Sequence, residues 1–291
     1  MKELRQITVV GLGLLGGSIT LAALRAFPGV KVVGYTHRAS TRRKAKRLAV
    51  ATEVTDDIRG SVAEADIVIL ATPICTFERD FGEIRDALPA GCIVTDVGST
   101  KGLVHRWAER VLPKNVYYVG SHPIAGSEQR GVEFARDDLF EGAICILTTT
   151  PGTNRRAAGT LRRFWTAIGC TVKVMAPAQH DRILAQVSHL PHITAVSLVN
   201  ANNIEDLKFA GKGFIDTTRI ASGPANIWVD VLLTNVDNIT KGIDKITAEL
   251  GKMKAAIKNG DGRQIEKLLE AARNKRSEMI KYKMRKKEII P

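Results

Sequence analysis

The chain has 291 residues, which is enough for one large or two ordinary domains with buried cores. Hydrophobic residues make up 44% and charged residues 25%, as in soluble globular proteins, and no apolar run approaches the roughly 20 residues that span a bilayer. The formal net charge is +13, but only 5% of the residues are aromatic and no nucleic-acid-binding motif is present, so we expect neither nucleic acid nor membrane as a partner.

The N-terminus and the cysteines exclude further classes of protein. Residues 1–6 lead directly into a strand-like run and leave no room for a signal peptide, so a cytoplasmic location is expected. The four cysteines are widely separated and form no C-x-x-C pair. We therefore expect buried free thiols and no metal site.

Short apolar runs alternate with helix-compatible stretches through the first half of the chain. These runs lie at residues 7–10, 30–35, 67–71, 92–96 and 117–119. Continuous apolar strands between helices indicate a parallel sheet that is buried on both faces. Two later runs, 143–147 and 171–175, flank a helix expected over 154–168, and we expect them to extend the same sheet.

The alternation of apolar strands and helices ends after Pro177. Helices are expected over 179–200, 226–258 and 264–287, with no strand between them. The predicted fold is therefore α/β: a Rossmann-type, doubly wound, mostly parallel sheet over residues 1–176, followed by an all-helical domain over residues 177–291.

A glycine-rich loop follows the first strand and opens the first helix. It reads Gly11-Leu12-Gly13-Leu14-Leu15-Gly16, and its place in a βαβ unit gives the G-x-G-x-x-G pattern its specificity for a dinucleotide. Gly11 allows the tight turn, Gly13 lets the backbone approach the pyrophosphate, and Gly16 permits close packing of helix and strand. Leu14 and Leu15 belong to the same expected cofactor site.

The end of the second strand bears on the choice of cofactor. An acidic residue that accepts the ribose hydroxyl of NAD is expected there, but the chain has Thr36, His37 and Arg38. A hydroxyl and a guanidinium suit a 2′-phosphate, and Arg42 and Arg43 are expected to reinforce them. NADP is therefore favoured over NAD.

Three further segments are expected near the nicotinamide. Thr72 and Pro73 follow the strand over 67–71, where ligands of such sheets collect. Ser99 follows the next strand, either near the nicotinamide or as a helix N-cap. His122 follows the run over 117–119 in a loop rich in glycine and proline, and it is the best candidate for a general base.

Six motifs in a fixed order give a resemblance to a known family. With these motifs the chain resembles the prephenate and arogenate dehydrogenases of tyrosine biosynthesis over roughly residues 5–235. The motifs are the glycine loop, Asp96-Val97-Gly98-Ser99-Thr100-Lys101, residues 121–128 (Ser-His-Pro-Ile-Ala-Gly-Ser-Glu), His180-Asp181, residues 188–192 (Ser-His-Leu-Pro-His) and residues 213–221.

The resemblance implies an NAD(P)-dependent oxidative decarboxylation of a cyclohexadienol. His122 would accept the proton of the ring hydroxyl while hydride leaves the same carbon, and Ser99 would orient that hydroxyl. Arg219 would hold a substrate carboxylate as a bidentate fork. His192 and Trp228 would line the substrate pocket.

The resemblance also implies a homodimer formed through the helical domain. Glu128 and Asp216 would form an ionic network with Arg219, and Asp216 would reach across from the partner subunit. Ser127, next to Glu128, is expected at the substrate as well. Ile215 departs from the pattern, because some relatives carry lysine at this position.

Several functional alternatives remain open. A hydrogen bond from His192 to the keto acid would favour prephenate as the substrate. An arogenate dehydrogenase and a dual-substrate cyclohexadienyl dehydrogenase are the alternatives. A β-hydroxyacid dehydrogenase would need a lysine within residues 179–200, which contain none. A non-catalytic NADP-binding sensor is disfavoured because His122, Ser99 and Arg219 are all present.

Overall fold

The structure is a computed structural model that describes residues 4–125 and 129–285. The chain divides into two compact units, Met1–Ile239 and Thr240–Pro291, which are described separately. No helix among the described residues is long and apolar enough to cross a membrane.

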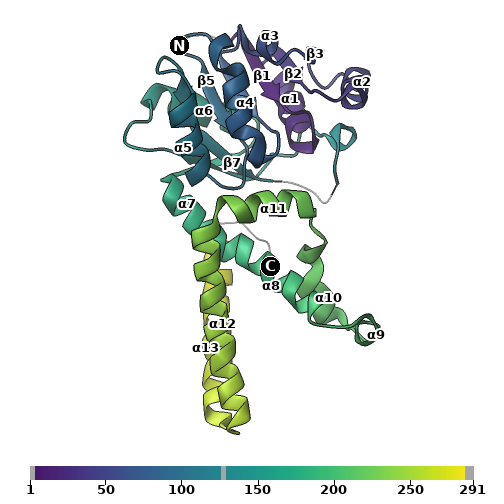
Figure 1. Cartoon of the computed structure of the whole chain (residues 1–291), viewed down its shortest axis with the longest axis vertical. Coiled ribbons are helices and arrows are strands. Elements are labelled where there is room, and N and C mark those ends of the chain that lie inside the picture. The colour runs from purple at the N-terminus through teal and green to yellow at the C-terminus, as the bar shows by residue number, and fades with distance from the viewer. Residues whose placement is uncertain (1–3, 126–128, 286–291) are drawn as a thin grey trace. The chain divides into compact units, whose positions relative to one another are not determined.

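A six-stranded parallel sheet forms the centre of the first unit (Figure 1), as the alternation of strands and helices predicts. Its order is β3-β2-β1-β4-β5-β6, so the strand order reverses beside β1. The strands are β1 (Gln6–Val10), β2 (Lys31–Tyr35), β3 (Glu53–Thr55), β4 (Ile67–Leu70), β5 (Ile93–Asp96) and β6 (Tyr117–Tyr118).

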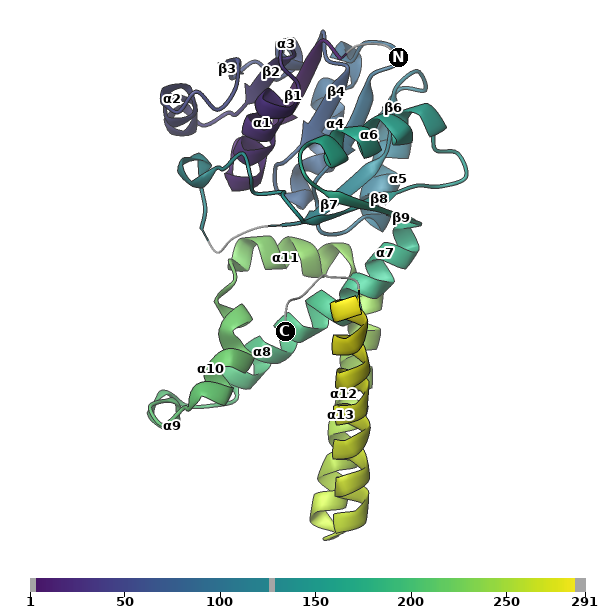
Figure 2. The ribbon, with the colours of Figure 1, turned by 180° about the vertical axis from the view of Figure 1, so that it is seen from behind.

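Helices cover both faces of this sheet (Figures 1 and 2). Ile7 and Val9 of β1 pack in one apolar cluster with residues of α1 and α6, whereas Val10 packs in another with residues of α4 and α5. Because successive strand residues point to opposite faces, a continuous apolar strand serves both clusters. The helices are α1 (Leu14–Ala26), α2 (Ala39–Arg47), α3 (Ile58–Val62), α4 (Phe77–Ile84), α5 (Gly102–Val111) and α6 (Arg155–Ala167).

A second sheet corrects two expectations from the sequence. β8 (Ile144–Thr148) and β9 (Thr171–Met175) do not extend the six-stranded sheet; they form a three-stranded sheet with β7 (Gly120–Ile124). The segment from β6 to β7 pairs with β5 through its first half and with β8 through its second half. His122 therefore lies within a strand, opposite Ile146, and not in a loop.

A helical region completes the first unit after Met175. The predicted helix over 179–200 is observed, but a π-helical segment (Ala185–His189) interrupts it. Pro191 lacks the N–H that would bond the carbonyl four residues earlier, which accounts for the break in the helical ladder. The helices are α7 (Pro177–Leu184), α8 (Leu190–Asn200), α9 (Ile204–Leu207), α10 (Lys212–Thr218) and α11 (Ala225–Thr234).

The predicted helix over 226–258 is divided at Asn235. This residue has φ −136° and ψ 37°, outside the helical region, so α11 ends at Thr234 and α12 (Val236–Lys258) begins just after it. The second unit contains most of α12 together with α13 (Gly262–Arg285), which run side by side in opposite directions (Figures 1 and 2). Gly260, at φ +64°, lies in the turn between them.

Candidate active site

The glycine loop has the shape of a cradle for an anion. Gly11 has φ +104°, and a Cβ on Gly16 would lie 1.9 Å from the carbonyl oxygen of Gly11, so neither position accepts a side chain. A Cβ on Gly13 would meet none of the described atoms within 4 Å. Within the described chain no side chain caps the N-terminus of α1, which begins at Leu14 and continues through Leu15. The loop and helix terminus therefore fit a pyrophosphate.

Of the three residues after β2 that are expected at the 2′-phosphate of NADP, two are exposed. His37 and Arg38 are exposed, whereas Thr36 is buried. The guanidinium of Arg42 donates hydrogen bonds to the carbonyl oxygens of Thr36 and His37 and pairs with Asp56 at 2.8 Å. Arg42 thus holds this segment in shape, whereas Arg38 and Arg43 are exposed.

The end of β4 packs against the glycine loop. A Cβ on Gly11 would lie 2.8 Å from the backbone of Ala71 and 2.9 Å from the side chain of Thr72. The Thr72 hydroxyl donates to the buried carboxylate of Asp80 at 2.6 Å, and Pro73 next to it is exposed. The structure therefore brings Thr72 and Pro73 to the same edge of the sheet as the glycine loop.

A cavity of about 510 Å³ lies between the strand ends and the helical region of the first unit. Ser99 from the segment after β5, His122 from β7 and Trp228 from α11 all line it. The π-helical segment contributes His189, whose pKa is lowered to about 4, chiefly by burial. The cavity thus unites three of the expected site residues.

Ser99 is half-buried and is not the N-cap of α5. The first turn of that helix is capped from elsewhere in the chain. The carboxylate of Asp181 accepts hydrogen bonds from the backbone N–H groups of Lys101 at 2.8 Å and Gly102 at 2.7 Å. The Ser99 hydroxyl is therefore not required for capping.

His122 is 9% exposed and shares a hydrogen bond with a second histidine. Its Nδ1 lies 2.8 Å from Nε2 of His180, and Nδ1 of His180 lies 2.8 Å from Oδ1 of Asp181. Burial lowers the pKa of His122 well below its ordinary value, and the neighbouring His180 and Lys101 lower it further. The ring is therefore neutral at physiological pH, as a proton acceptor must be.

His192 is stacked on Trp228, with ring centroids 3.5 Å apart and an interplanar angle of 9°. One nitrogen of the His192 ring hydrogen-bonds the backbone of Ile220. Its Nδ1 is buried and has no hydrogen-bond partner among the residues that the structure describes. Trp228 thus connects His192 to the wall of the cavity.

The remaining expected residues lie outside this cavity or outside the described chain. Asp216 is an exposed residue of α10, and Arg219 opens the 3₁₀ turn Arg219–Ser222 directly after it and is also exposed. Ser127 and Glu128 lie outside the described residues. The ionic network expected around Arg219 stays a prediction.

Two buried features were not among the residues selected from the sequence. One is the His180–Asp181 pair, whose only signal was its presence among the family motifs. The other is an ion pair between Lys101 and Asp96, which also belong to one of the family motifs; both are 0% exposed, and Asp96 also accepts from the Tyr118 hydroxyl at 2.7 Å. Lysine is rarely buried, so a lysine beside the start of a helix is expected at the surface, and no local pattern indicates its burial.

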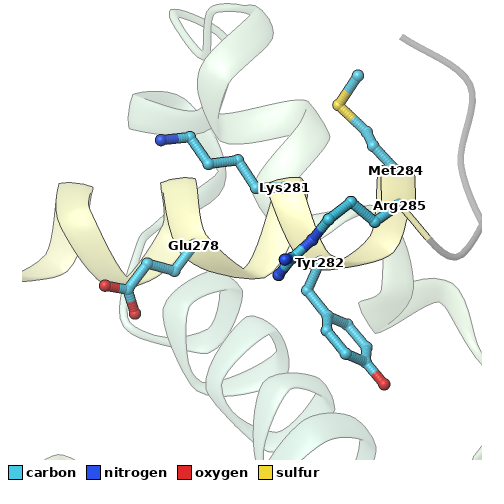
Figure 3. Close-up of a pocket in the computed structure, with 5 residues that line it drawn as sticks. All are labelled: Glu278, Lys281, Tyr282, Met284 and Arg285. Atoms are coloured by element: carbon cyan, nitrogen blue, oxygen red, sulfur yellow. The ribbon is translucent and has the colours of Figure 1, made fainter.

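A larger hollow of about 690 Å³ lies on α13 in the second unit, far along the chain from these residues. Its side chains come from a single helix and spread away from one another rather than converging (Figure 3). Such an arrangement does not resemble a site that encloses a ligand.

Comparison with known proteins identifies the family. The family described as prephenate dehydrogenase, nucleotide-binding domain, matches residues 19–174, and the one described as prephenate dehydrogenase, dimerization domain, matches residues 176–271. Prephenate dehydrogenase of Bacillus subtilis is 35% identical over 98% of this chain and 78% of its own length. Cyclohexadienyl dehydrogenase of Zymomonas mobilis is 32% identical over 90% of this chain and 92% of its own length.

A solved structure agrees with these matches. Prephenate dehydrogenase of Aquifex aeolicus, in complex with hydroxyphenyl propionate and NAD+, is 33% identical and superposes with a TM-score of 0.88 over 95% of this chain and 98% of its own. The nucleotide-binding match also agrees with the anion cradle at the glycine loop, and the chain is an NAD(P)-dependent oxidoreductase. The chain belongs to the prephenate dehydrogenase family.

Proposed function

We propose that this protein oxidatively decarboxylates prephenate to 4-hydroxyphenylpyruvate in tyrosine biosynthesis, with hydride transfer to NADP+. One observation carries the proposal: a neutral, buried histidine, His122, lines a cavity together with Ser99. Membership of the family, whose relatives include prephenate dehydrogenases, supports the choice of substrate.

In this proposal His122 and Ser99 act on the ring hydroxyl of the substrate. The glycine loop would hold the oxidised cofactor, which would supply the acceptor for the hydride. His122 takes the hydroxyl proton as the ring carbon becomes a carbonyl, and Ser99 orients the hydroxyl toward it. Loss of the ring carboxylate as carbon dioxide then returns an electron pair to the ring, and the oxygen regains a proton as a phenol. The proton that His122 accepts is therefore needed again at the end of the reaction.

We assign substrate binding to the residues around the cavity. Arg219 would pair with a substrate carboxylate, and His192 and Trp228 would form the wall beside the side chain. Ser127, Glu128 and Asp216 would complete the polar surroundings. Their place in the family motifs and the position of Trp228 on the cavity support this assignment.

Removing the guanidinium of Arg219 is expected to weaken substrate binding. In Arg219→Ala, KM should rise about 10- to 100-fold, because a charge-assisted hydrogen bond to a carboxylate contributes about 1.5–3 kcal/mol. Steady-state kinetics at saturating cofactor measure the change. Arg162→Ala, at an exposed position of α6, is the matched control. An unaltered KM in Arg219→Ala would move the carboxylate site elsewhere.

The preference for NADP is also a proposal, supported by the exposed Arg38 beside the second strand. In Arg38→Ala, KM for NADP+ should rise about 10-fold while KM for NAD+ stays the same, because only NADP+ carries the 2′-phosphate. Arg47→Ala, an exposed position at the end of α2, is the control. Equal changes with both cofactors would contradict this assignment.

One observation favours arogenate as a second candidate substrate. One nitrogen of the His192 ring donates its hydrogen to the backbone carbonyl oxygen of Ile220. In a neutral ring the other nitrogen, Nδ1, then carries no hydrogen and can only accept. This Nδ1 has no hydrogen-bond partner among the described residues. An acceptor suits the ammonium group of arogenate better than the keto group of prephenate. An acceptor at Nδ1 argues against the interpretation of His192 as a donor to the keto acid. A dual-substrate enzyme is therefore also a candidate.

We also propose a domain boundary at residues 176–177 and a homodimer formed through the helical region. Several large apolar side chains of this region are exposed in the single chain, among them Ile204 at 70%, Phe209 at 90% and Leu233 at 63%. Such exposure is costly unless a partner covers it. Sedimentation velocity is expected to give twice the mass of the 31.7 kDa chain, and a monomer at micromolar concentration would contradict the proposal.

Initial rates with both substrates and both cofactors test the proposed function. We expect the highest kcat/KM for prephenate with NADP+. A higher value for arogenate would select the second candidate, and no turnover in any of the four combinations would contradict both.

A further inference from the structure

His122, His180 and Asp181 form an unbroken chain of hydrogen bonds that ends on a helix N-terminus. The three residues come from two parts of the first unit: His122 from β7, His180 and Asp181 from α7. Both links measure 2.8 Å, and the three side chains are buried, His180 completely. Only one assignment of donor and acceptor in each of these hydrogen bonds satisfies every group.

Asp181 sets the donors and acceptors of this chain. Burial alone would raise the pKa of Asp181, but hydrogen bonds from His180, Gly102 and Lys101 outweigh it and hold the pKa below the ordinary value. The carboxylate is therefore ionised and can only accept. It receives the N–H groups of Lys101 and Gly102 at the positive end of the α5 helix dipole, which fixes its position.

The state of Asp181 fixes the hydrogens of both histidines. Because Asp181 only accepts, Nδ1 of His180 carries the hydrogen in their bond. Burial lowers the pKa of His180, so this ring is neutral and its Nε2 is an acceptor. The hydrogen of the second bond then belongs to Nδ1 of His122. A neutral His122 with its hydrogen on Nδ1 has a free lone pair on Nε2.

We propose that His180 and Asp181 are positioning residues that hold His122 in the tautomer required of a general base. Without an acceptor at Nδ1, the ring is free to place its hydrogen on Nε2, the nitrogen left for the substrate, and in that form it cannot take the hydroxyl proton. Asp181 also stabilises the positive charge that the pair of histidines gains when His122 is protonated. This role rests on the proposed function of His122.

The surrounding charges agree with this direction. Lys101 lies close enough to lower the pKa of both His122 and His180, and its positive charge opposes the early protonation of either ring. The carboxylates of Asp181 and Asp96, in contrast, raise the pKa of His180. A positive charge that forms at His122 is therefore best accommodated toward His180, next to Asp181.

The arrangement also joins the two domains that we propose. His122 belongs to the sheet region, whereas His180 and Asp181 belong to α7, which begins at Pro177, and Asp181 caps α5 of the nucleotide-binding part. The base is thus prepared only when α7 is docked against α5.

Two substitutions of His180 separate this role from simple packing. The glutamine side chain in His180→Gln keeps an acceptor for His122 and a donor for Asp181, whereas the leucine in His180→Leu fills the space and keeps neither. We expect kcat to fall about 100-fold or more in His180→Leu with little change in KM, and to recover most of this loss in His180→Gln. Equal losses in both variants, or none in either, would overturn the proposal.

The tautomer is measured directly and without turnover. In protein labelled with ¹⁵N-histidine, long-range ¹H–¹⁵N spectra distinguish Nδ1–H from Nε2–H, and the His122→Asn spectrum identifies the His122 signals among the six histidines. We expect Nδ1–H for His122 in the wild type and in His180→Gln, and loss of this preference in His180→Leu. An Nε2–H tautomer in the wild type would overturn the proposal. Because this readout needs no substrate, it is independent of a failure of the proposed function, which would appear as inactive wild-type protein.

Discussion

In the variant His122→Asn, kcat is expected to fall about 10²- to 10⁴-fold, the range that a positioned general base contributes. Asparagine keeps the approximate size and polarity of the ring but cannot accept a proton at neutral pH. The substrate hydroxyl would then lose its proton only to water. Stopped-flow or steady-state rates of cofactor reduction measure the loss.

The binding of the cofactor serves as the control for this variant. His122 lies in β7 and lines the cavity, whereas the glycine loop belongs to β1 and α1, so the dissociation constant for the oxidised cofactor should change less than about twofold. Fluorescence titration measures it. Turnover equal to that of the wild type would remove His122 from the role of base, and a large loss of cofactor affinity would show that the substitution acts through the fold.

The second large effect concerns the buried ion pair of Lys101 and Asp96. In Asp96→Asn, the free energy of unfolding should fall by about 3–5 kcal/mol, because the ammonium of Lys101 would stay buried without a counter-charge. The carboxylate of Asp96 also accepts from the Tyr118 hydroxyl and from the backbone N–H of Gly98 at 2.8 Å. Urea unfolding followed by circular dichroism measures the change.

Two controls frame this measurement. Asp86→Asn removes a carboxylate from an exposed pair with Arg85, whose side chains are 69% and 53% exposed, and should cost at most about 1 kcal/mol. In the double variant Asp96→Asn, Lys101→Met, the loss should shrink because neither charge of the pair remains. A loss in Asp96→Asn no larger than that in Asp86→Asn would contradict the importance of the buried pair.

The local features of the fold were predictable from the sequence. The glycine loop, the apolar strands and the helices each depend on neighbouring residues, and they occur near the predicted positions, although the helix over 226–258 is divided at Asn235. The pairing of strands was not predictable in the same way. The runs over 144–148 and 171–175 look like strands of the main sheet, and only the bend between Tyr118 and Gly120 assigns them to a second sheet.

The site shows the same division between local and long-range information. His122 and Ser99 stand out because each belongs to a short motif, although the structure places His122 within β7 and not after a strand. The hydrogen bond from His122 to His180 joins residues 58 positions apart, and its geometry depends on the docking of α7. The burial of Lys101 likewise depends on packing that no local pattern records. The placing of Ser99 and His122 at one cavity could therefore be anticipated from their motifs, whereas the long-range contacts around them could not.

In the proposed function, one site couples the loss of hydride to the loss of carbon dioxide. The most direct measurement follows reduced cofactor by absorbance and carbon dioxide by trapping, in the same reaction of the wild-type protein with prephenate and NADP+. We expect one carbon dioxide for each reduced cofactor, at every time point. Cofactor reduction without carbon dioxide, or no prephenate-dependent reduction at all, would contradict it.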